Sequence, residues 1–188
     1  MRNRLVLAAL TLFLTIGIAS AEQHEHRQLE SHEHGVGLLN VAWEDKVLAI
    51  ELISPAMNIV GFEHSPADPA EDQAVQQATK TLEDGERVFS LPVEAQCQLT
   101  EAEVETSIED EHEDEHDKDE HDGEHDDEVH SEFHVNYEFS CANPDALTHI
   151  DVNLFALFPG TEALQVQVVT EQGQTSVKLS AESARIAL

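Results

Sequence analysis

A run of acidic residues and histidines between Glu109 and Glu132 restricts most strongly what this chain can fold into. Of its 24 residues, 15 are Asp or Glu, five are His and one is Lys. Such a composition leaves almost nothing to bury, so the run cannot contribute to a hydrophobic core. We therefore predict a long disordered loop over residues 109–131, inserted in a folded domain.

The histidines of this loop and the strand after it recur every four or five residues. They are His112, His116, His121, His125, His130 and His134. Three pairs are four residues apart, and on a helical turn such a pair can bind one ion. Imidazole suits zinc, copper and nickel, whereas calcium makes no use of it. Ordering the backbone costs about 1–2 kcal/mol per residue, so we expect a loop that collects several Zn²⁺ ions loosely.

Residues 22–34 show no apolar periodicity and are predicted to form a flexible arm. The arm contains two His-x-His pairs, His24 with His26 and His32 with His34. In an extended segment both rings of such a pair point to one side, where they can bind one metal ion. The single histidines His64 and His149 favour structural roles when the residues alone are considered.

The first 21 residues are typical of a signal peptide that is cleaved after Ala21. Arg2 and Arg4 precede the apolar run Leu5–Ile18, which is shorter than the roughly 20 residues that a membrane span needs. No Cys follows the cleavage site, so no lipid anchor is indicated. We expect an exported chain in the periplasm, without direct membrane insertion.

The formal net charge of −30 excludes several classes of partner. A chain of this charge repels nucleic acid and anionic membranes and attracts cations. The expected mature chain has Met57 as its single Met, which disfavours a copper(I) carrier and leaves Zn, Ni and Cu(II) open. The chain contains no G-x-S-x-G, C-x-x-C or P-loop signature, so we do not expect an enzyme.

Short apolar and β-branched runs predict a single, mainly β domain over residues 35–188. Its expected form is antiparallel and β-rich, either sandwich-like or α+β, with one helix. The predicted strands cover residues 35–43, 47–53, 100–108, 133–141, 149–158, 163–170 and 176–179, with a short helix or strand at 184–188. Residues 54–66 are expected to form an irregular connection. The helix begins after Asp68, with Pro69 in its first turn and Glu71 completing a capping box, and ends before Gly85.

Two cysteines flank the acidic loop. In an exported protein a lone pair is more often a disulfide than a metal site, so we predict a bond between Cys97 and Cys141. Continuing an antiparallel register from this pair places two further pairs opposite each other, Val104 with His134 and Thr106 with Glu132. The apolar alternation slips between Leu99 and Ala102, which requires a β-bulge near Thr100.

Five segments of the chain carry a family resemblance: "HEHGVGLLNVAW", "LAIELISPAMNIVGFEHSP", "YEFSC", "VNLFALFP" and "GQTSVKLS". They resemble the ZrgA-type family of zinc-regulated periplasmic zinc-uptake proteins. The resemblance implies a periplasmic zinc-binding component that helps deliver zinc to an inner-membrane ABC-type importer. The family's "HEHG" falls on His32 and His34, and its "GFEH" falls on His64, which makes His64 a candidate ligand.

We therefore expect two kinds of zinc site. A tighter site is formed by His32, His34 and His64, with His134 or an acid as a further ligand, and the loop supplies weaker sites that feed it. Three other readings remain open. They are a storage or resistance buffer for Zn, Ni or Cu(II), a copper/zinc metalloenzyme, and a structural or adhesive domain.

Overall fold

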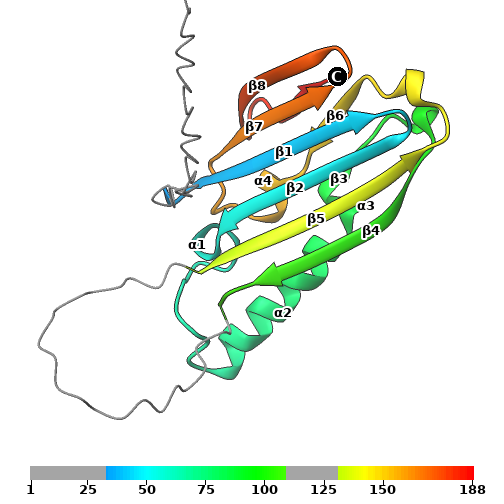
Figure 1. The fold of residues 1–188 in the computed structure, drawn as a ribbon. Coiled ribbons are helices and arrows are strands. Elements are labelled where there is room, and N and C mark those ends of the chain that lie inside the picture. The colour runs from blue at the N-terminus through cyan, green and yellow to red at the C-terminus, as the bar shows by residue number, and fades with distance from the viewer. Residues whose placement is uncertain (1–32, 109–130) are drawn as a thin grey trace, which may run out of the picture. The chain divides into compact units, whose positions relative to one another are not determined.

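The chain folds around a six-stranded sheet with the strand order β4-β5-β2-β1-β7-β8 (Figure 1). The computed structural model describes residues 33–108 and 131–188, which belong to one compact unit. The strands are β1 (Val36–Glu44), β2 (Val47–Pro55), β4 (Cys97–Thr106), β5 (Glu132–Cys141), β7 (Ala163–Thr170) and β8 (Gly173–Ser180). Neighbouring strands are antiparallel, except that β1 and β7 run parallel.

The parallel pair makes the sheet mixed, whereas the sequence predicted antiparallel strands. Between β5 and β7 the chain passes through β6 (His149–Val152) and the single-turn helix α4 (Leu154–Leu157). This crossover returns the chain to the end at which β1 begins. There the amides of Glu162 and Ala163 donate to the carbonyl oxygen of Gly35 at 2.7 and 2.9 Å. As a result, β7 starts beside the start of β1 and follows it in the same direction.

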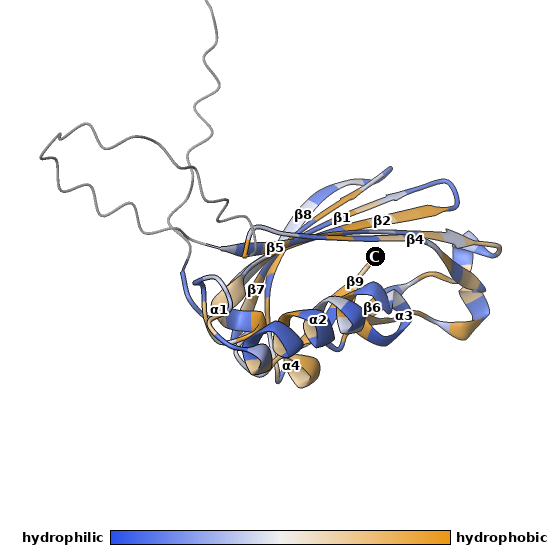
Figure 2. Ribbon diagram, turned by 90° about the horizontal axis from the view of Figure 1, so that it is seen from below, coloured by the Kyte–Doolittle hydropathy of each residue, from blue (hydrophilic) through white to orange (hydrophobic). Residues whose placement is uncertain are grey.

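Helices and a small second sheet cover one face of the large sheet (Figure 2). The small sheet has the order β3-β6-β9. The remaining elements of this layer are α1 (Ala56–Ile59), α2 (Pro69–Glu83), α3 (Gly85–Val88), β3 (Phe89–Ser90) and β9 (Arg185–Ala187). The fold is therefore the α+β form of the predicted β-rich domain, and its described residues contain three single-turn α-helices besides the predicted one.

Alternation along the strands separates a buried inner face from an outer face. On β5 the inner residues are Phe133, Val135, Tyr137 and Phe139, each at most 2 % exposed. The residues between them are polar and partly or fully exposed. A strand places successive side chains on opposite faces, so the inner residues build the core with the helical layer. His134 and its polar neighbours occupy the outer face.

Helix α2 begins as the sequence predicts. The side chain of Asp68 accepts hydrogen bonds from the amides of Ala70 and Glu71 at 2.7 and 3.1 Å, which satisfies donors that the first helical turn leaves free. Glu71 Oε2 in turn accepts from the amide of Ala67 at 2.7 Å. The helix ends at Glu83, before Gly85.

The inner face of α2 packs on the sheet through Val75, Ala78 and Leu82. Tyr137 Oη on β5 donates to the carbonyl oxygen of Leu82 at 2.7 Å. Gly85, which opens α3, also lies against β5, because a Cβ atom there would approach Tyr137 Cδ1 to 2.9 Å. Helix α2 thus packs on the large sheet through a narrow face of small and apolar residues.

The β4–β5 hairpin contains the predicted disulfide and the predicted bulge. Cys97 is bonded to Cys141, and the register shifts between Leu99 and Glu101. Beyond the bulge each partner is displaced by one residue from the expected register. Val104 therefore lies opposite Val135, and Thr106 lies opposite Phe133. The extra residue on β4 shifts the register by one, so that apolar residues of β4 lie opposite apolar residues of β5. Without the bulge, Val104 would lie opposite the polar residue His134.

Two segments differ from their predicted form. Residues 56–59, expected to be irregular, form α1, and residues 149–158 divide into β6 and α4 instead of one strand. Asn153 marks the division, since its amide donates to the carbonyl oxygen of Val88 at 2.9 Å and its side chain to that of Arg87 at 3.0 Å. Strands β1 and β2, and strands β7 and β8, each form an antiparallel hairpin.

The predicted signal peptide, most of the arm and nearly all of the acidic loop lie outside the described residues. None of the helices in the described ranges has the length and apolar character to cross a membrane.

Candidate metal-binding site

His134 and Glu132 form a pair on the outer face of β5. His134 Nε2 and Glu132 Oε1 are in hydrogen-bond contact, and the two side chains are 38 % and 24 % exposed. They are two positions apart on one strand, so the pleat sends both to the same side. When Nε2–H donates to the carboxylate, the lone pair of Nδ1 remains for a metal ion.

A hollow of about 530 Å³ adjoins this pair. Glu105, Thr106 and Ser107 line it from β4 and its end, opposite Glu132 and His134. Glu105 is the cross-strand partner of His134. The hollow therefore presents one imidazole and two carboxylates, and all three positions are held by paired strands.

Hydrogen bonds fix the two points at which residues 109–130 leave the sheet. The amide of Ser107 donates to the carbonyl oxygen of Glu132 at 3.2 Å, and the amide of Glu132 donates to Ser107 Oγ at 3.1 Å. Ile108, the last described residue before the gap, is 1 % exposed. The His134–Glu132 pair thus lies directly beside a rigid attachment point of the His-rich segment.

A second pair, His34 with Glu63, stands before β1. His34 Nε2 is 3.3 Å from Glu63 Oε1, with side chains 56 % and 14 % exposed. The backbone beside His34 is held by Asn58, whose Oδ1 accepts from the amide of Gly35 at 2.6 Å. Gly35 has a φ of +84°, which glycine adopts without a steric penalty. This turn aims the chain into β1 and keeps His34 next to Glu63.

His64 has a separate set of contacts. Its Nδ1 lies 2.9 Å from the carbonyl oxygen of Ser65 and 3.9 Å from Glu71 Oε2. The ring stacks on Phe62 with centroids 5.0 Å apart and an interplanar angle of 23°. An Nδ1–H that donates to Ser65 leaves Nε2 as the possible metal ligand, and the side chain is 59 % exposed.

The connection around Glu63 joins the end of the arm to the end of the loop. The carboxylate of Glu63 contacts His34, while its carbonyl oxygen accepts from Ser131 Oγ at 2.8 Å. The carbonyl oxygen of Ser131 accepts from the amide of Ala56 at 2.8 Å. Through this connection the structure brings together the two points at which the His-rich segments meet the fold.

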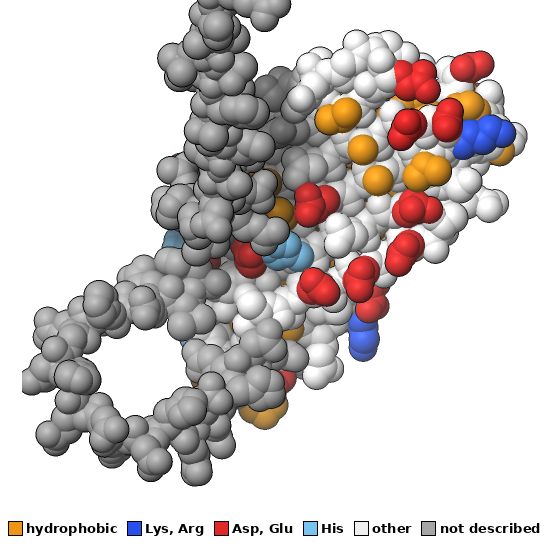
Figure 3. Space-filling model, in the orientation of Figure 1, with side chains coloured by type: hydrophobic (Ala, Val, Ile, Leu, Met, Phe, Trp, Pro, Cys, Tyr) orange, Lys and Arg blue, Asp and Glu red, His pale blue; other side chains and the backbone are white. Residues whose placement is uncertain are grey.

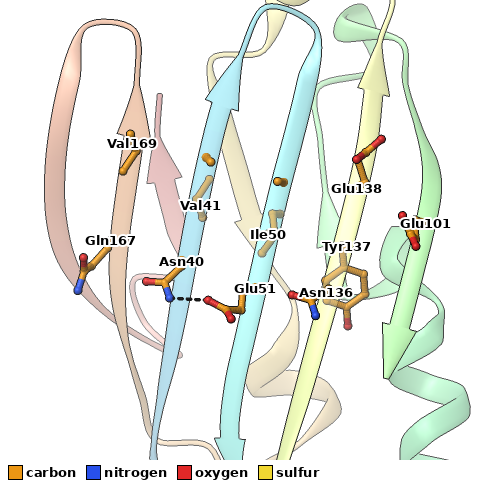
Figure 4. Close-up of a pocket in the computed structure, with 12 residues that line it drawn as sticks. Asn40, Val41, Ile50, Glu51, Glu101, Asn136, Tyr137, Glu138, Gln167 and Val169 are labelled. Atoms are coloured by element: carbon orange, nitrogen blue, oxygen red, sulfur yellow. Dashed lines mark hydrogen bonds between the residues drawn. The ribbon is translucent and has the colours of Figure 1, made fainter. Parts of the chain in front are cut away.

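Carboxylates dominate the rest of the outer face on β4 and β5 (Figure 3). Glu101 on β4 lies opposite Glu138 on β5, and Asn40 Nδ2 donates to Glu51 Oε2 at 2.8 Å across β1 and β2 (Figure 4). These residues line a hollow of about 570 Å³. Like charges placed this close attract cations to the face.

The predicted cluster of His32, His34 and His64 is not assembled by the described residues alone. His32 lies outside them, and His34 and His64 contact different carboxylates. Within residues 33–108 and 131–188, no three His, Cys, Asp or Glu side chains are arranged to hold one metal ion. The other predicted ligands also lie outside the described residues and stay predictions; they are His24, His26, His112, His116, His121, His125 and His130.

Sequence reasoning missed the carboxylate partners. Glu63 precedes His64 in "GFEH" but contacts His34, which only the fold reveals. Glu132 was recognisable, because "EFH" in a strand places its first and last residues on one face. His149, interpreted as structural, lies 3.8 Å from Asp151, which also binds Arg185 through two hydrogen bonds.

A family model described as ZrgA family zinc uptake protein matches residues 31–188 of the chain. A search of curated proteins finds no match.

Proposed function

This chain belongs to the ZrgA family of zinc uptake proteins, and on that basis we propose that it is a periplasmic zinc-binding protein that assists an inner-membrane ABC-type importer. The family gives the chain a role in zinc uptake. The periplasmic location is supported by the export-type N-terminus, and the net charge of −30 suits a protein that attracts cations. Its task is binding and transfer without catalytic turnover.

The observation that carries the proposal is the position of two His–carboxylate pairs. His34–Glu63 begins two residues after His32, and His134–Glu132 begins two residues after His130. Each pair thus joins a folded anchor to a His-rich segment of the chain. Zinc takes four ligands in most protein sites, and the imidazole of each pair, oriented by its carboxylate, supplies one of them. The segments outside the described residues supply further imidazoles.

Such partial sites favour transfer. Zinc held by one fixed ligand and several exchangeable ones can be released stepwise, because an acceptor replaces one ligand at a time. We assign the loop the role of a low-affinity collector and the two anchored pairs the role of tighter sites. A storage or resistance buffer would use the same ligands but would not transfer its zinc to an importer.

Calorimetric zinc titration tests this division of roles. The purified protein is compared with a variant that lacks residues 109–129 and with His134→Ala and His34→Ala. We expect the deletion to remove several weak sites and leave tighter binding, and each single substitution to weaken the tighter binding. His149→Ala is the matched control, since this histidine also contacts a carboxylate but lies on the small sheet. An unchanged stoichiometry after the deletion would exclude the collector role.

Dependence on pH tests whether imidazole is the ligand. Zinc binding requires neutral imidazole, and free imidazole titrates at about pH 6.5. Affinity should therefore be clearly lower at about pH 5.5 than at about pH 7.5. Equal affinity at both pH values would indicate carboxylate binding alone. The importer role is tested separately, in cells that lack this gene. The zinc-loaded protein should restore zinc uptake to these cells, and the loop-deleted form should not.

A further inference from the structure

The two edges of the large sheet differ in charge. On the edge strand β4, Glu101, Glu103 and Glu105 alternate with apolar or neutral residues. The opposite edge strand, β8, has the sequence GQTSVKLS, with no acid and one base, Lys178. Charged side chains on an edge strand oppose pairing with another chain. The β4 edge is thus protected by like charges, and the β8 edge is not.

The β8 edge is open over most of its length. In the described part of the chain β8 pairs with β7 alone, and its residues from Gly173 to Lys178 are exposed. Val177 is 42 % exposed. Only the end of the strand is occupied, by a bridge between Ser180 and Ser183. An open edge carries a row of backbone N–H and C=O groups that can pair with a further strand.

A hollow of about 580 Å³ lies beside this edge. Gly173, Gln174 and Thr175 of β8 line part of it. Its apolar lining residues include Trp43, Leu147, Val168 and Leu188. Among the described side chains that line it, Asp145 alone is acidic. An added strand would therefore meet unpaired backbone groups next to a hollow with a partly apolar lining.

We propose that β8 pairs with β8 of a second copy of this chain, so that the two large sheets form one continuous sheet. A twofold axis makes identical edge strands run antiparallel and gives a closed dimer. The charge distribution favours a second copy of this chain as the partner of β8. Two copies with a net charge of −30 repel each other over most of their surface, whereas residues 163–188 contain two acids and two bases. A cationic partner would instead be attracted to the carboxylates of β4 and β5.

Sedimentation equilibrium of the purified protein in EDTA tests the proposal, because the chelator prevents dimers bridged by zinc. We expect a dimer whose fraction rises with NaCl. Added salt shortens the Debye length from about 10 Å at 0.1 M to about 3 Å at 1 M and so screens the repulsion, while backbone pairing persists. A monomer at all concentrations and salt levels overturns the proposal.

Two independent substitutions locate the interface. Val177→Glu and Thr175→Glu each place an acid on the β8 edge and should raise the dimer dissociation constant by roughly tenfold or more. The matched control is Val93→Glu, which adds the same charge at a residue that is 81 % exposed on a different element. Circular dichroism shows whether each variant is folded. If Val93→Glu weakens the dimer as much as a folded β8 variant does, the edge is not the interface.

Discussion

The carboxylate of Glu132 contacts the imidazole of His134 across the outer face of β5, while Phe133 between them is fully buried. The contact orients the ring and leaves one ring nitrogen for a metal ion. It also places a negative charge on the side of the ring opposite that ion. Partners of this kind raise the basicity of a ligating histidine.

Glu132→Gln should therefore weaken zinc binding at the loop attachment by about 10- to 100-fold. The amide retains the size of the side chain but loses its charge. Competition against a chromophoric chelator measures the affinity. Glu101→Gln removes the same charge from the same face of the sheet, away from any described histidine, and is expected to have a much smaller effect. Equal losses in both variants would show that only the overall charge matters.

The hydrogen bond from Tyr137 to Leu82 should stabilise the packing of α2 on the sheet. The hydroxyl group is buried, and burial raises the pKa of Tyr137, so it stays protonated. Tyr137→Phe leaves the Leu82 carbonyl without this donor and should lower the free energy of unfolding by about 1–2 kcal/mol. The ring remains, so the edge-to-face contact with Phe89 is retained. Urea unfolding measures the change, and an unchanged midpoint would show that water replaces the donor.

The disulfide should contribute stability without contributing to zinc binding. Cys97 and Cys141 are 44 residues apart in the chain, and closing a loop of this size stabilises a protein by about 2–4 kcal/mol. The double substitution to Ser should lower the free energy of unfolding by that amount, as measured in urea. Zinc stoichiometry should stay the same, since neither sulfur is a proposed ligand. A loss of zinc sites in the folded double variant would contradict this assignment.

The Asp151–Arg185 pair should stabilise the small sheet only above acidic pH. Hydrogen bonds from Arg185 hold the pKa of Asp151 below its usual value. A carboxyl group whose pKa is lower in the folded state stabilises that state above its unfolded pKa of about 3.9, and the contribution is lost as the pH falls toward the folded value. Both side chains are substantially exposed, so the effect is small.

Asp151→Asn should accordingly lower the thermal midpoint slightly at neutral pH. It should leave the midpoint nearly unchanged below the pKa that Asp151 has in the folded protein. Differential scanning calorimetry across this pH range measures the difference. Glu103→Gln, which also removes one exposed carboxylate from a strand, serves as the control. A difference between wild type and Asp151→Asn that persists unchanged in acid would rule out an electrostatic origin.

Local chemistry made much of the fold predictable from sequence. Asp68 and Pro69 specify the start of α2, the period-2 pattern specifies β5, and the slip in apolar alternation before Ala102 reveals the bulge. The parallel pairing of β1 with β7 was not predictable, because it depends on where the crossover returns and not on any pattern within the two strands. The partnership of Glu63 with His34 was missed for the same reason, since it joins two connections that only the fold brings together.

The pairing of β1 with β7 also governs the order in which the molecule can fold. The β1–β2 hairpin consists of local contacts, but Val36 and its neighbours on β1 must find Ala163 and the rest of β7 near the other end of the chain. Contacts between residues so distant in sequence slow folding. Until β7 arrives, the central strand β1 exposes an unpaired apolar edge of the kind that aggregates. Strand β7, which is synthesised late, is therefore the strand that covers the edge of β1 and protects it from aggregation.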